Sequence, residues 1–319
     1  MAPTLDHTAY PYIIDEIIAF APLASLLQLR GTSQSFRARI NALLFDHAEL
    51  RISNRHPRVR ALHVPKGRKF AGACIPWIPS LVHTLDVDVR TTRDRGAKNG
   101  PLPFTALRSI RRFGLPKGNG TPRLTLPDMP GTVVDYIDLS EQGPYQSVRF
   151  EGAGERQIVH LCWNELVRTS KHYAVLPGKA WPAELVFVLW PVARPADDVP
   201  GGSSVVPDQP LFMGIFQSVA GIFFRGAWGT VQCTVVGLEH IHPHNVPLLG
   251  DPAPAPPRPD LAAGVAAFRA GFTRTVGVFP GHAESAREVA ADVRCVTREE
   301  WWAELGEEKE LVGKWPADS

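Results

Sequence analysis

The sequence has no paired cysteines and no long hydrophobic run. Its four cysteines stand singly, without a CxxC pair, which excludes a disulfide framework and a zinc-finger site and is typical of a reducing compartment. The longest apolar stretch, Leu211 to Phe224, is interrupted by Gln217 and Ser218 and is too short to span a bilayer. No secretory signal stands at the start. We therefore expect a soluble protein of the cytoplasm and/or the nucleus, with no membrane contact and this stretch as a buried helix.

Catalytic signatures are also missing. The sequence has no G-x-S-x-G motif, and none of its cysteines stands in an active-site context. The glycine-rich segment Gly114–Gly120 lacks the Lys-Ser/Thr ending of a phosphate-binding loop, and Pro122 stands where a helix would have to begin. His240, His242 and His244 alternate, but no paired spacing nearby completes a metal site. We expect no enzyme, no catalytic residue, no cofactor and no metal.

Charge is unevenly distributed along the chain. Residues 51–127 contain sixteen Lys and Arg but only three Asp, whereas residues 283–319 contain ten acids and five bases. Such asymmetry can steer an acidic partner to one end of the molecule. Nucleic-acid binding is one hypothesis for the basic segment, although few aromatic side chains are interleaved with its bases for base stacking. A solvated basic face is the interpretation that we favour.

Residues 10–50 show the clearest helical periodicity. Apolar residues at positions 13, 14, 17, 18 and 21 form one stripe of a first helix. Pro11 suits a first turn, and Pro22 ends the helix because its ring clashes with the preceding turn. A second short helix follows, and Gly31 can close it in a left-handed conformation. Ser33 or Ser35 can cap a third helix. Three such short helices bury little surface alone, which is typical of a docking module.

This run resembles an F-box of the fungal type. The residues that carry the resemblance are Pro11, Ile14, Ile17, Ile18, Pro22, Leu26, Leu27, Leu29, Arg30, Ser33, Phe36, Arg37 and Ile40. Tyr10 departs from the pattern, because the family usually has leucine before the proline. The resemblance implies docking to a Skp-type adaptor, and through it to a cullin ligase, while the rest of the chain recruits an unidentified protein substrate for ubiquitination. The implied partner-binding residues are Pro11, Ile14, Ile17, Ile18, Leu26, Leu27, Leu29 and Phe36.

The remainder predicts an α/β body with a mostly parallel sheet, so that the fold class is α+β overall. Apolar triplets of constant spacing begin at residues 59, 82, 107, 134, 158, 185 and 233. They resemble the strand portion of leucine-rich repeats, although any β-rich chain can contain such triplets by chance. A helix is expected over 261–275, and a final helix over 297–306 with a capping box at Thr297 and Glu300.

We expect three parts: an F-box-like module over 10–50, a substrate-recognition domain over 51–306 and a frayed acidic tail over 307–319. Two alternatives stay open. The protein could be a basic nucleic-acid-binding protein with a structural helical head, or the first helices could serve only to complete the core, in which case deletion of residues 1–50 would unfold the body.

Overall fold

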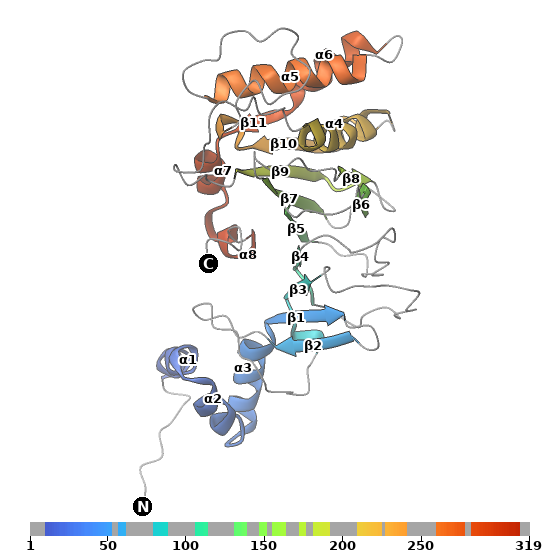
Figure 1. Cartoon of the computed structure of the whole chain (residues 1–319). Coiled ribbons are helices and arrows are strands. Elements are labelled where there is room, and N and C mark those ends of the chain that lie inside the picture. Colours follow the sequence, from blue (N-terminus) through green and yellow to red (C-terminus); the bar gives the residue numbers. More distant parts are fainter. Residues whose placement is uncertain are drawn as a thin grey trace, which may run out of the picture.

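The computed structural model shows an elongated molecule, with three helices at one end of a long sheet and a helical pair at the other (Figure 1). The chain is therefore a mixed helix-and-strand protein, as the sequence predicts. The residues that the structure describes are 10–52, 57–61, 79–88, 106–113, 131–138, 147–151, 155–163, 172–176, 181–191, 209–224, 227–240, 260–277 and 282–312.

The first three helices form a small unit, residues 11–45, which we call the helical module. They are α1 (Pro11–Phe20), α2 (Leu23–Arg30) and α3 (Gln34–Phe45). Ser33 caps α3, since its hydroxyl accepts a hydrogen bond from the Phe36 backbone N–H at 3.1 Å. The left-handed conformation predicted for Gly31 is wrong: its φ is −78°, because α2 ends in a right-handed turn. A separate apolar core holds the module together, made of Ile14, Ile18, Leu26, Ile40, Leu44 and Phe45.

The nine-stranded sheet is parallel apart from one edge hairpin. Its order is β11-β10-β9-β7-β5-β4-β3-β1-β2, and only β1 and β2 pair antiparallel. The strands are β1 (His47–Ile52), β2 (Pro57–Ala61), β3 (Thr84–Asp88), β4 (Ser109–Phe113), β5 (Thr132–Asp138), β7 (Arg156–Trp163), β9 (Glu184–Pro191), β10 (Gln232–Val236) and β11 (Arg294–Val296). The parallel strands follow one another in chain order without reversal, unlike in a doubly wound fold, where the order reverses at a switch point.

The pairing register repeats from strand to strand. Residues paired at the strand starts are Thr84, Ser109, Thr132, Arg156 and Glu184, which lie 23 to 28 residues apart. Backbone hydrogen bonds link each strand start to the residue that immediately precedes the neighbouring strand, for example from Thr132 N at the start of β5 to Arg108 O before β4, at 3.0 Å. Each repeat therefore contacts mainly its neighbours, which is the arrangement of a solenoid.

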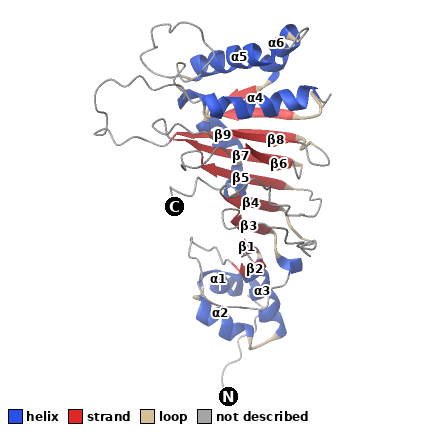
Figure 2. Cartoon of the chain, turned by 45° about the vertical axis from the view of Figure 1, so that its right-hand side comes forward, coloured by secondary structure: helices blue, strands red, loops and turns tan. Residues whose placement is uncertain are grey.

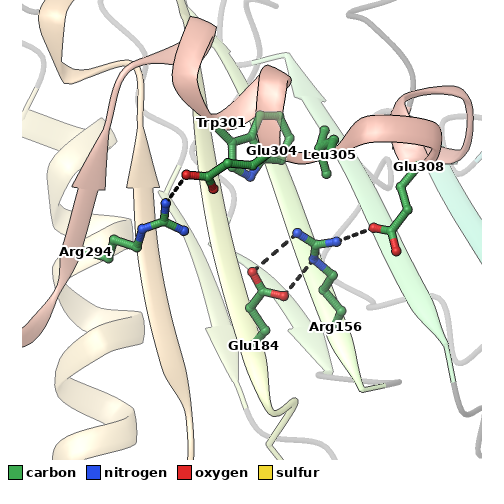
Figure 3. A pocket seen from close by; sticks show the side chains of 7 residues that line it. All are labelled: Arg156, Glu184, Arg294, Trp301, Glu304, Leu305 and Glu308. Carbon is green, nitrogen blue, oxygen red and sulfur yellow. Dashed lines mark hydrogen bonds and ion pairs between the residues drawn. The ribbon is translucent and has the colours of Figure 1, made fainter.

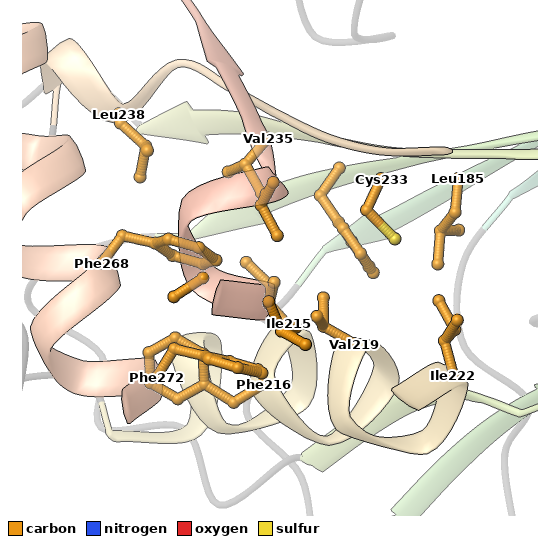
Figure 4. Close-up of a cluster of buried hydrophobic side chains, with 14 of the residues drawn as sticks. Leu185, Ile215, Phe216, Val219, Ile222, Cys233, Val235, Leu238, Phe268 and Phe272 are labelled. Carbon is orange, nitrogen blue, oxygen red and sulfur yellow. The ribbon is translucent and has the colours of Figure 1, made fainter. Parts of the chain in front are cut away.

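A small second sheet and three helices cover the outer face of the main sheet. A second, two-stranded sheet of β6 (Ser147–Glu151) and β8 (His172–Leu176) lies beside α4 (Gln209–Phe224), followed by α5 (Leu261–Gly277) and α6 (Ala283–Asp292) (Figure 2). Buried side chains from α4 and α5, including Phe216 and Phe268, meet the strand residues Leu185 and Val235 in one core (Figure 4). None of the described helices combines the length and apolar character needed to cross a bilayer.

The C-terminal helices cover part of the opposite face, which we call the inner face. The segment comprises α7 (Arg298–Glu304), η5 (Gly306–Glu308) and α8 (Lys309–Val312), on the other side of the sheet from β6 and β8 (Figure 1). The capping box predicted at Thr297 and Glu300 is present. The frayed tail predicted from residue 307 is wrong as far as Val312, which is 1% exposed because it packs into the inner-face core. Residues 313–319 lie outside the described part.

A buried ion pair explains why the triplet at residue 107 has a charge where its neighbours are apolar. Arg112 pairs directly with Asp135 on the next strand, and its guanidinium donates two hydrogen bonds to that carboxylate, one of 2.7 Å from Nη2 to Oδ2. Gln157, on the following strand, donates a third to Asp135 Oδ2 at 2.9 Å. Asp135 is fully buried, so its charge is tolerated because three donors surround it.

Other expected repeats fall out of register. Val59, which begins the first triplet, lies on β2, and this strand forms an antiparallel hairpin with β1 and is not a parallel repeat. The rest of that triplet lies outside the described residues. Ile158, which begins the triplet on β7, pairs with Val186 of β9. The triplet on β9 begins at Leu185, one residue earlier than this register requires. The parallel strands therefore follow one another at a regular spacing, and the apolar triplets mark their positions only approximately.

Two helical glycines offer a matched test of this packing. A Cβ on Gly264 of α5 would lie 2.3 Å from the carbonyl oxygen of Leu238, whereas one on Gly221 of α4 would meet only Trp181 side-chain carbons, at 3.7 Å or more. Both Gly→Ala changes gain about 1 kcal/mol of helix propensity, but only the change at Gly264 meets a backbone clash, which costs about 1–3 kcal/mol or more. We expect Gly264→Ala to lower and Gly221→Ala to preserve or raise the free energy of unfolding, measured by urea denaturation. Equal effects would contradict the close approach of α5 to Leu238.

Candidate docking surfaces

The structure separates the eight expected partner-binding residues into three groups. Ile14, Ile18 and Leu26 are buried inside the helical module, so the expectation that they contact a partner directly needs correction. They face α3 because three short helices have no other core. Leu29 and Phe36 are half-buried against the same core. The exposed residues of the set are Pro11, Ile17 and Leu27.

A second apolar stripe lies on the solvent side of α1. It consists of Tyr10, Ile13, Ile17 and Phe20, which we call the apolar stripe. Ile17 is 51% and Phe20 72% exposed. At 100° per residue, these positions lie roughly a quarter turn around the axis from the buried Ile14 and Ile18. The helix is thus apolar on two adjacent sides, and the described residues bury only one of them.

Sequence reasoning missed Ile13 and Phe20 as surface residues. The spacing 10, 13, 17, 20 is itself a helical stripe, and it overlaps the stripe that contains Ile14 and Ile18. Two overlapping stripes on a ten-residue helix indicate that both sides are covered by something. Both stripes are visible in the sequence, but only the structure shows which side of α1 packs against α3.

The module joins the sheet with almost no linker. Asp46 alone separates α3 from β1, and its carbonyl oxygen accepts hydrogen bonds from the N–H groups of His83 and Thr84, both at 2.9 Å. Leu81 packs against the module's core. The boundary expected at residue 50 therefore lies inside β1, and a deletion of residues 1–50 would remove a strand together with the helices. This places the apolar stripe at a fixed end of the sheet.

The inner face changes character along the sheet. On β1, β3 and β4 it carries a polar cluster, in which Arg111 donates two hydrogen bonds to the Asp86 carboxylate, at 2.7 and 2.9 Å. His47 Nε2 lies 2.9 Å from Asp86 Oδ1 and 2.8 Å from Arg111 Nη2. Burial alone would raise the pKa of Asp86, but hydrogen bonds from His47 and Arg111 outweigh it, so that the pKa lies below its ordinary value of 3.8.

A stack of rings follows on β4, β5 and β7. Phe113, Tyr136 and His160 occupy the same register position, with ring centroids 4.8 and 4.7 Å apart and an interplanar angle of 4° for both pairs. Burial lowers the pKa of His160 to about 3, so its ring is neutral. The Trp190 indole N–H donates to His160 Nδ1 at 2.7 Å. The stack begins on β4, the strand that carries Arg111 of the polar cluster, and continues into the apolar core under α7.

A pocket of about 330 Å³ lies where α7 and η5 meet the sheet (Figure 3). Arg156 stands between Glu184 and Glu308, at 2.8 and 2.5 Å, and Arg294 pairs with Glu304. Trp301 is also part of the lining, and its indole nitrogen is buried with no hydrogen-bond partner among the described residues. Both glutamates from the C-terminal segment are about half exposed, so these pairs contribute little to stability.

The remaining expectations are tested only in part. Among the described residues, no group of three potential metal ligands exists. His240 instead contacts Glu239 and Arg298, and His242 and His244 lie outside the described part. In the basic segment, Arg111 and Arg112 are engaged in internal ion pairs, and most of its other Lys and Arg residues lie outside the described part.

Comparison with protein-family models, with curated proteins and with solved structures gave no match. Functional inference therefore rests on the surfaces themselves.

The polar cluster makes a prediction about acid stability. Because folding lowers the pKa of Asp86, its contribution is fully present above about pH 4 and is lost as the pH falls through the lowered pKa. We expect Asp86→Asn to reduce the free energy of unfolding by about 2–4 kcal/mol near pH 7. The difference between the two proteins should shrink below pH 4 in urea titrations. A difference that stays constant down to pH 2 would show that Asp86 gains nothing from its partners.

Proposed function

We propose that the protein recruits substrates to a Skp–cullin–F-box type ubiquitin ligase, with the helical module as an F-box-like domain and the sheet as a leucine-rich-repeat-like body. The observation that carries this proposal is the apolar stripe on α1. Four large apolar side chains in line on one short helix are a docking face rather than scattered surface residues. The F-box-like residue pattern in the same helices supports a Skp-type adaptor as the partner.

The structure revises the contact set within this proposal. Ile13, Ile17, Phe20 and Leu27 are exposed and would contact the adaptor. Ile14, Ile18 and Leu26 would act indirectly, since they hold α1 and α2 against α3. An amphipathic helix that offers one apolar side to a groove is a common recognition mode.

The sheet would supply the recruiting surface. Sequential parallel strands build an extended inner face, which is the face that solenoid proteins use for binding. The chain would contribute proximity and no chemistry: a target held near the conjugating enzyme has a raised effective concentration, while other subunits carry out the transfer. The nucleic-acid alternative would rely on the other basic residues of the segment 51–127, because Arg111 and Arg112 are engaged in internal ion pairs.

Two charges, one in the apolar stripe and one at the exposed Leu27 of α2, test the docking. We expect the double variant Ile17→Asp/Leu27→Asp to lose co-purification with a Skp-type adaptor, because two desolvated apolar contacts are worth about 2–4 kcal/mol, or roughly 30- to 1,000-fold in affinity. Tyr12→Asp is the matched control: Tyr12 is 64% exposed but lies off the stripe, so this variant should bind normally.

Stability measurements accompany the pull-down. Both variants should unfold at the wild-type temperature, whereas Ile14→Asp should lower it, because Ile14 is in the module's core. If the double variant still binds the adaptor, the proposed contact face is wrong. Absence of adaptor binding by the wild type, together with salt-sensitive retention on heparin, would favour the nucleic-acid alternative.

A further inference from the structure

The last described segment, residues 306–312, differs from α7 in how it is held. We call it the latch; it comprises η5 and α8. α7 is fixed by a capping box and by two buried side chains, Trp301 and Leu305. Among the residues with described side chains, the latch has one buried apolar anchor, Val312. Few buried contacts indicate a low free energy of local opening.

A glycine separates the two parts. Gly306 has a φ of +52° and lies just after the α7 cap residue Leu305, and a Cβ there would meet no atom within 4 Å. Its conformation therefore comes from the turn itself and not from surrounding packing. Left-handed glycines at the ends of elements commonly absorb hinge rotations. Only the latch would move in such a rotation.

The latch occupies the inner face at a specific place. The Tyr136 hydroxyl donates a hydrogen bond to the carbonyl oxygen of Val312, and the Val312 side chain belongs to the core that contains Tyr136 and has Phe113 packed against it. Glu308 pairs with Arg156 on β7 at 2.5 Å, over the charged pocket of Figure 3. One aliphatic side chain, one main-chain carbonyl and one carboxylate are thus recognised by residues of the sheet.

We propose that the latch is a displaceable occupant of a peptide-binding site on the inner face at β4, β5 and β7. Its contacts specify the ligand class: a short peptide with a compact aliphatic side chain, whose carbonyl accepts from Tyr136, preceded by an acidic residue that pairs with Arg156. A tethered segment has an effective concentration in the millimolar range, so the latch excludes weaker peptides. The role of the peptide as a recruited substrate rests on the function proposed above, but the binding site does not.

The test uses the full chain and the latch's own sequence. A fluorescent peptide of residues 306–315 is titrated with the wild type and with Val312→Asp, in which the anchor is removed, and anisotropy is recorded. We expect Val312→Asp to bind the peptide at least about tenfold more tightly than the wild type, because the peptide then no longer competes with the tethered latch. Adding Tyr136→Phe to that variant should weaken binding about fivefold, and a peptide carrying Val312→Asp should not bind.

Equal affinity of the wild type and Val312→Asp, or no binding by either, would overturn the proposal. Hydrogen exchange on the wild type gives a second readout that needs no variant. Amides of 306–312 should exchange at least about 100-fold faster than those of α7 and β7. Equal protection would show that the latch is part of the rigid fold. Neither experiment contains an adaptor, so their outcome is independent of whether the helical module docks one.

Discussion

Both faces of a parallel sheet have to be covered, because its strands are apolar on both sides. Here the outer face is covered by α4, α5, β6 and β8, all of which lie between strands in the chain. In the described part of the chain, no element between strands covers the inner face, and the segment after the last strand returns across it. The position of the C-terminal helices follows from this requirement, and so does the division of the inner face into a covered apolar part and a polar part.

The polar part of the inner face carries charged side chains instead of a covering helix. On β1, β3 and β4 no described helix lies over the sheet, and the register positions that are Val134, Ile158 and Val186 farther along hold Asp86 and Arg111. Paired charges can remain partly solvated, whereas valines at these positions would expose apolar surface to water. The transition occurs at Phe113 and Tyr136, whose stacked rings can border both environments. A face with both environments can recognise a ligand by apolar and by polar contacts.

Much of this architecture could be predicted from the sequence, and the missed parts share a cause. Strong periodicity located α1, α4 and α5, and local chemistry located the caps at Ser33 and Thr297. Periodicity could not show which element packs against each apolar side of a helix. Ile14 and Ile17 look alike in the sequence, but α3 covers only the first. Val312 was missed because its contact, Tyr136, is 176 residues away, and such long-range pairings leave no local pattern.

The regular pairing of the strands also fixes a length. Neighbouring strands lie about 4.8 Å apart, so three steps, from β1 through β3 and β4 to β5, set the latch's site on β5 about 15 Å from the strand that continues directly from the helical module. Because Asp46 is the only residue between that module and the sheet, little slack exists at the junction. The number of strands between the helical module and the latch's site therefore sets the distance between them. Insertion or deletion of one repeat would change that distance by one strand spacing and would leave the residues at both ends unchanged.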